Sequence, residues 1–150
     1  MALIERSMLV PFAAERMLAL VNDVASYPEF LPWCAGSEVV QQDDGTQHAG
    51  LNIRYKGIKQ RFSTRNQTEQ PSADKPGSIK MTLLDGPFRL LDGQWLFQPL
   101  DSGSCKIEFR LRYEFSSKIL EKTLGPAFGG IANSFVDAFV KRAESLYGNG

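Results

Sequence analysis

Residues 117–147 most constrain what this chain can fold into, because they have the spacing of a long helix with one apolar face. Apolar side chains recur there at steps of three or four residues, the spacing that lines one side of an α-helix. The stripe consists of Phe128, Ala132, Phe135, Phe139, Ala143 and Leu146. Flanking apolar residues widen it to about half of the circumference. Such a helix needs an equally wide apolar partner.

The ends of this helix and one interruption can also be predicted. Ser116 or Ser117 suits the N-cap position, and Gly148 suits the stop. Gly125 and Pro126 predict a kink, or a short helix followed by a new start at Pro126, since proline lacks the amide hydrogen and clashes with the preceding turn.

The partner surface is expected from residues 37–115, which contain six runs with the period-two alternation of β-strands. In residues 105–115 apolar and polar side chains alternate strictly, which is typical of a strand with one buried face. A strand over 4–10 and a helix over 13–24 are expected before them. Residues 27–34, with two prolines, predict one or two helical turns.

This order of elements predicts one α+β domain over residues 1–150. Its expected architecture is a curved antiparallel sheet of about seven strands around a long C-terminal helix. Both apolar surfaces are then buried against each other, and a cavity can remain between them.

Composition excludes several classes of function. Seventeen basic and seventeen acidic residues cancel, so only a local patch could bind nucleic acid or a membrane surface. Cys34, Cys105 and His48 are too few for a metal site or a histidine triad, so no metal and no cofactor are expected. No run approaches the roughly 18 apolar residues of a membrane span, and a cytoplasmic location is expected.

Four blocks carry a family resemblance. They are Leu20-Val-Asn-Asp-Val with Tyr27-Pro-Glu-Phe-Leu-Pro-Trp-Cys, then Phe62-Ser-Thr-Arg-Asn, Asp85-Gly-Pro-Phe-Arg-Leu-Leu-Asp-Gly-Gln-Trp-Leu-Phe, and Val136-Asp-Ala-Phe-Val-Lys-Arg-Ala. In this order the chain resembles the START-like (Bet v 1/SRPBCC) helix-grip superfamily. Within it, the chain is similar to the family of coenzyme Q-binding proteins and ribosome-association toxins, formerly named oligoketide (polyketide) cyclase-like.

The resemblance implies non-catalytic binding of a hydrophobic small molecule, ubiquinone or a related isoprenoid lipid, by a carrier or chaperone that supports respiration. The alternative that it implies is a toxin that binds the large ribosomal subunit and blocks subunit joining. Peripheral contact with a membrane is a further expected interaction. Fold alone does not choose among these functions.

The candidate ligand-binding side chains come from the 27–34 segment, the sheet and the C-terminal helix. They are Phe30, Pro32, Trp33, Leu51, Ile53, Trp95, Phe97, Phe109, Tyr113, Phe128, Ile131, Phe135 and Phe139. Each alone has an ordinary core position as its alternative. Gly125, Gly129 and Gly130 favour a cavity, because each helical glycine costs about 1 kcal/mol relative to alanine. Trp33 belongs either to a lid at the cavity mouth or to a structural corner.

A basic hairpin is the candidate surface for a macromolecular partner. Arg54, Lys56, Lys59 and Arg61, followed by Arg65, have no acidic residue among them. The first four form the candidate patch for the phosphate groups of ribosomal RNA or anionic lipid headgroups. A solvated hairpin without a partner is the alternative.

Catalysis is not expected. A cyclase needs a general acid and a general base that converge on the pocket. The sequence spacing brings no two candidates together among Asp85, Asp92, Glu114, Arg142, Tyr113 and His48. Arg142 lies near the edge of the helical stripe, where it suits a ligand headgroup or, as the preferred interpretation, a salt bridge to Asp85 or Asp92.

Overall fold

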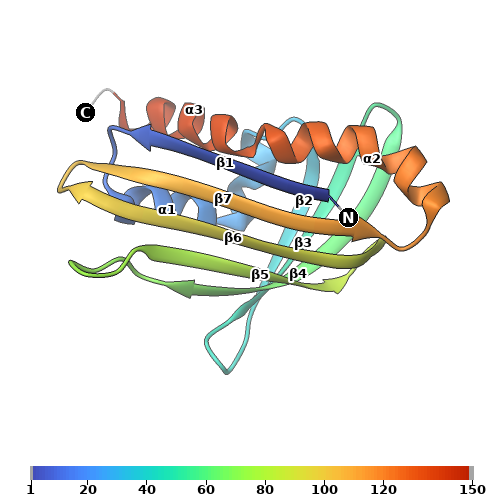
Figure 1. Ribbon diagram of the computed structural model, residues 1–150, viewed down its shortest axis with the longest axis horizontal. Helices are drawn as coiled ribbons and strands as arrows, with labels where there is room; N and C mark the ends of the chain where they lie inside the picture. Colours follow the sequence, from blue (N-terminus) through green and yellow to red (C-terminus); the bar gives the residue numbers. More distant parts are fainter. Residues whose placement is uncertain (1, 149–150) are drawn as a thin grey trace.

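The protein is described here from a computed structural model, which describes residues 2–148. Seven strands, two α-helices that follow one another at the C-terminus, an N-terminal α-helix and a 3₁₀-helix make up the fold (Figure 1). In chain order they are β1 (Ala2–Val10), α1 (Ala14–Asn22), η1 (Val24–Glu29), β2 (Cys34–Gln41), β3 (Gln47–Tyr55), β4 (Ile58–Glu69), β5 (Gly77–Asp85), β6 (Phe88–Asp101), β7 (Ser104–Phe115), α2 (Lys118–Asn133) and α3 (Phe135–Tyr147).

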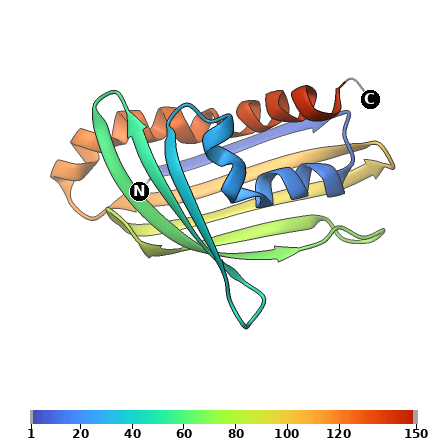
Figure 2. The ribbon, with the colours of Figure 1, turned by 180° about the vertical axis from the view of Figure 1, so that it is seen from behind.

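The strands form one curved sheet in the order β1-β7-β6-β5-β4-β3-β2, with every neighbouring pair antiparallel. α2 and α3 run along one side of this sheet, and α1 lies on the same face (Figures 1 and 2). α1 packs on β5, β6 and β7, while α2 contacts β7 and β1. The predicted α+β fold, with a seven-stranded sheet around the C-terminal helix, is therefore confirmed.

Strict alternation in β7 buries its apolar face as predicted. Cys105, Ile107, Phe109, Leu111 and Tyr113 are all buried, and the residues between them are exposed or half-buried. These inward side chains meet the apolar stripe of α2 and α3, so the sheet and the helices bury each other's apolar surface.

The predicted new start at Pro126 is wrong, because α2 continues through Gly125 and Pro126 and the helix breaks at Ser134, while a kink at this point stays a prediction. Leu124 and Phe128 are buried on either side of the proline, and their packing holds this stretch in helical conformation. At the actual break, the Ser134 hydroxyl donates a hydrogen bond to the Ile131 carbonyl over 2.8 Å. Such a local bond competes with the regular helical pattern.

Ser117 is the N-cap of α2, one of the two positions predicted, and its hydroxyl accepts a hydrogen bond from the Leu120 backbone N–H over 3.2 Å. Ser117→Ala leaves that N–H without this partner, so we expect the free energy of unfolding to fall by about 1 kcal/mol. Urea denaturation measures this change. Ser102→Ala, in an exposed turn, is the control; equal stability of the two variants would contradict a capping role.

Within residues 2–148, no helix is long and apolar enough to cross a bilayer.

Candidate functional site

An internal cavity lies between the concave face of the sheet and the C-terminal helices, with a volume of about 50 Å³. Its walls are mostly aromatic and aliphatic. The predicted ligand-binding residues that line it are Leu51, Trp95, Phe109, Phe128, Phe135 and Phe139. The structure thus gathers side chains from β3, β6, β7, α2 and α3 around one space.

A second, smaller cavity of about 20 Å³ lies beneath α2, at the end where the β3–β4 and β5–β6 turns meet this helix. Ile53, Phe128 and Ile131 from the predicted set line it, together with Phe62. Phe62 and Phe128 also line the larger cavity, and their ring centroids are 6.2 Å apart. These two rings therefore stand between the two cavities.

Three predicted ligand-binding residues line an outer groove of about 620 Å³ rather than the interior. Phe30, Pro32 and Trp33 face α3 and the end of α2 there, and Ile131 contributes to the same groove. Most of Trp33 is nevertheless buried: it is only 4% exposed, and its ring centroid lies 5.3 Å from that of Phe135.

The remaining two predicted residues line neither cavity. Phe97 is fully buried and stacks on Trp95 with the ring planes 7° apart. Tyr113 packs edge-on against Phe128 and lines a surface groove at the start of α2, and burial raises the pKa of its hydroxyl.

The interior is too small for a ring-sized ligand in this conformation. An apolar cavity of about 150 Å³ is the size that holds benzene, three times the volume found here. A ring would fit only if a wall moved, and the break at Ser134 separates the two helices, α2 and α3, that form one wall. Gly129 and Gly130 do not serve close packing, because an added Cβ would meet only the Tyr113 hydroxyl at 3.7 Å from the first and nothing within 4 Å from the second.

Two polar residues on the cavity wall were missed in the sequence. Thr64 and Asn66, on β4, are each 6% exposed and line the larger cavity. The Thr64 hydroxyl donates a hydrogen bond to Asn66 Oδ1 over 2.7 Å. Extending the period-two pattern inward from Phe62 would have identified both, since residues two apart on a strand share a face.

The larger cavity offers few side chains that could carry out acid–base chemistry. Among the described residues that line it, Tyr27 is the only ionisable side chain. Burial is the main cause that raises the Tyr27 pKa far above its ordinary value, so its hydroxyl stays protonated and donates to the Val21 carbonyl. Within residues 2–148 no cluster of three or more His, Cys, Asp or Glu side chains could hold a metal ion.

The expected salt bridge from Arg142 to Asp85 or Asp92 is wrong. Arg142 pairs with Glu29 over 3.2 Å and lies over the Phe30 ring at 4.9 Å. α3 places Arg142 beside the end of η1 and the residue after it, whereas Asp92 pairs with an arginine on the outer face of the sheet.

The β3–β4 hairpin presents part of its predicted basic patch freely. Arg54 and Lys59 lie directly opposite each other across the strand pair, and Lys56 occupies the turn with a positive φ of 49°. Among residues 2–148, none of these three has a carboxylate within salt-bridge distance. Arg61 differs, because it pairs with Glu38 over 3.3 Å.

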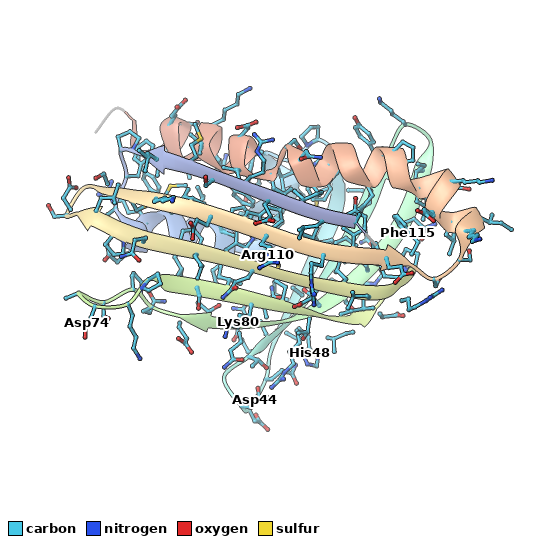
Figure 3. The ribbon with its side chains drawn as sticks, viewed as in Figure 1. Asp44, His48, Asp74, Lys80, Arg110 and Phe115 are labelled. Carbon is cyan, nitrogen blue, oxygen red and sulfur yellow. The ribbon has the colours of Figure 1, made fainter. Side chains whose placement is uncertain are left out.

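Arg65 lies outside this free patch because Asp44 neutralises it. The two side chains are 2.7 Å apart, and Asp44 lies at the tip of the projecting β2–β3 turn (Figure 3). Hydrogen bonds from Thr46, and then from Arg65, hold the pKa of the Asp44 carboxyl well below its usual range.

A curved sheet that holds a C-terminal helix around an apolar cavity defines a helix-grip domain of the START-like type. The chain belongs to the polyketide cyclase / dehydrase and lipid transport family, whose model matches residues 10–140.

Two named relatives differ in how closely they match. The ribosome association toxin RatA of Vibrio cholerae serotype O1 (strain N16961) is 47% identical over 146 residues, which cover 97% of each chain. The coenzyme Q-binding protein COQ10 homolog B, mitochondrial, of Xenopus laevis is 28% identical, and the match covers 95% of this chain but 58% of that protein.

Solved structures share the fold. A START superfamily protein from Mycobacterium smegmatis has a TM-score of 0.75 at 20% identity, with 96% of this chain and 98% of that chain covered. The Zhui aromatase/cyclase from Streptomyces has a TM-score of 0.79 at 14% identity, with 99% and 98% covered. At these identities the likeness concerns the fold alone.

Proposed function

We propose that the protein binds a hydrophobic ligand between its sheet and its C-terminal helices, without chemistry of its own. The observation that carries this proposal is the pair of cavities, about 50 and 20 Å³, which share Phe62 and Phe128 as walls. Their apolar walls suit an isoprenoid lipid such as ubiquinone once a wall moves to make room for it, because each buried methylene gains about 0.8 kcal/mol and needs no directional partner.

A binding role is favoured over cyclase chemistry by the composition of the cavity wall. General acid–base catalysis needs two positioned groups whose pKa values suit proton transfer. Tyr27, the one ionisable side chain among the described lining residues, is held protonated and engaged with a backbone carbonyl. The description of the family, which includes lipid transport, and the name of the Xenopus relative are in line with binding.

Purified protein is expected to carry apolar lipid that solvent extraction and mass spectrometry detect. Ala49→Phe puts a large ring into the cavity that Ala49 lines and should abolish this lipid, at a cost of about 1–3 kcal/mol in stability from overpacking. Val40→Phe, at an exposed position on β2, is the matched control. If no lipid copurifies and added ubiquinone does not bind saturably, the carrier function is wrong.

Association with the large ribosomal subunit is the second candidate function. The relative that bears this name matches almost the whole chain at 47% identity, against 28% for the coenzyme Q-binding relative. The comparisons therefore favour this function more than the sequence alone did.

A feature of the hairpin supports the same candidate. Arg54 and Lys59 face each other directly across β3 and β4. Like charges in that position destabilise a strand pair, and a phosphate-rich surface would turn this repulsion into attraction. The hairpin patch is outside the cavity, so ligand binding and ribosome association can reside in one molecule.

A further inference from the structure

The inner face of β4 changes character along its length. From the hairpin tip inward it presents Ile58, Gln60, Phe62, Thr64 and Asn66 at every second position. The first three line the smaller cavity and the last three line the larger one, with Phe62 common to both. The inner face of β4 therefore lines both cavities, from the hairpin end of the molecule to the polar residues Thr64 and Asn66 in its interior.

Asn66 has an unused hydrogen-bond donor on this wall. The Thr64 hydroxyl donates to Asn66 Oδ1, which fixes the orientation of the amide. Asn66 Nδ2 donates none of the side-chain hydrogen bonds found among residues 2–148. Asn66 as a whole is only 6% exposed, so a ligand that enters the cavity and accepts from Nδ2 would give this donor a partner that bulk water does not readily supply.

An unused acceptor lies on the neighbouring strand. Gln47 is the direct cross-strand partner of Asn66, and its Oε1 is buried without a hydrogen-bond partner. Met81, on the other side of Asn66, and Leu111 are apolar, so the polar groups are confined to this part of the wall. Gln47 lies beside the larger cavity and not in its lining, so Asn66 Nδ2 is the spare hydrogen-bonding group on the cavity wall itself.

We propose that Thr64 and Asn66 form a headgroup subsite, which selects hydrophobic ligands whose ring carries a carbonyl oxygen and which holds that ring innermost. This inference rests on the proposed ligand-binding function and adds its specificity. Once a wall has moved to make room for the ring, its carbonyl oxygen accepts a hydrogen bond from Asn66 Nδ2, and the ring lies beside Trp95 and Phe109. The apolar tail passes between Phe62 and Phe128 toward the smaller cavity and leaves near the β3–β4 hairpin.

A comparison of two ligands on the unaltered protein tests the subsite. Decylubiquinone and decylbenzene share the tail, but only the first has ring carbonyls. A site with a buried donor discriminates against a ligand that cannot use it. We expect decylubiquinone to quench tryptophan fluorescence saturably, and decylbenzene to displace it only at about tenfold higher concentration.

The double substitution Thr64→Val and Asn66→Leu should remove this preference. Both hydrogen-bonding partners are then replaced by apolar groups of similar size, so no polar atom of the pair stays unsatisfied. Decylubiquinone affinity should fall about tenfold, and decylbenzene affinity should hold or rise. Gln67→Leu, on the outward face of the same strand, is the matched control and should leave both affinities unchanged.

The possible results distinguish failure of the headgroup subsite from failure of the proposed ligand-binding function. Equal affinity of the unaltered protein for the two ligands overturns the subsite but leaves ligand binding standing, and this result needs no variant to fold. A preference that survives the double substitution assigns it to other residues and also overturns the subsite. If neither ligand binds, the ligand-binding function itself fails.

Discussion

Trp33→Ala is expected to lower the free energy of unfolding by about 3–5 kcal/mol, the usual cost of truncating a buried aromatic side chain. Trp33 is 4% exposed and packs against Phe135, on the first turn of α3. Its backbone carbonyl accepts a hydrogen bond from the Arg54 N–H over 2.9 Å, which ties the corner to β3. At about 2–4 °C per kcal/mol for a domain of this size, the melting temperature should fall by roughly 6–20 °C.

This result would favour the structural corner over the lid, the two interpretations that the sequence left open for Trp33. Thermal unfolding followed by circular dichroism measures it, alongside lipid uptake at a temperature where both proteins are folded. Pro32→Ala, at the exposed neighbouring position, is the matched control and should change the melting temperature little. A nearly unchanged melting temperature with lost lipid uptake would instead support the lid.

The strands were predictable because each has one wet face and one buried face, which imposes a strict period of two on the sequence. β7 is the clearest case, because Phe109 is buried and the next residue, Arg110, is exposed; Figure 3 shows Arg110 on this strand. The helix break was not predictable in the same way. Pro126 is the strongest local signal, but the burial of Leu124 and Phe128 outweighs it.

The candidate site was predictable only in part, because alternation identifies the face of a strand but not the position of a cavity along it. Phe97 shares the inner face of β6 with Trp95, yet it pairs with Gly77, at the end of the sheet that α1 covers, and belongs to the core. Thr64 and Asn66 were overlooked for the opposite reason. Polar residues are mostly exposed, so their inward position becomes evident only from the continuation of Phe62's face.

The basic patch on the β3–β4 hairpin was also predicted only in part. The local run of residues predicted that Arg61 belongs to a patch without acidic neighbours. In the structure β2 pairs with β3, and the Glu38 carboxylate lies 3.3 Å from the Arg61 guanidinium. Contacts between strands distant in sequence cannot be read from the local run of residues. The free charges are therefore Arg54, Lys56 and Lys59.

Replacing Arg54, Lys56 and Lys59 by glutamine is expected to weaken association with the large ribosomal subunit strongly, if the hairpin is the contact surface. Each lost phosphate contact lowers the slope of log K against log salt concentration by about 1, so the slope should flatten by about 3. Sedimentation of the protein with large subunits over a salt series measures both quantities. Lipid uptake should be unaffected, since these side chains point away from the cavities.

Two variants separate the hairpin from a general effect of charge. Replacing Lys75, Lys80 and Lys141 by glutamine also removes three positive charges from a chain of zero formal net charge, but at positions away from the hairpin (Figure 3 shows Lys80 on β5). This control should keep most of the binding. Arg61→Gln alone should have a small effect, because Glu38 already neutralises Arg61. Equal loss of binding in both triple variants would indicate long-range electrostatic attraction without a defined contact, whereas binding that neither variant changes would exclude the hairpin as the ribosomal contact.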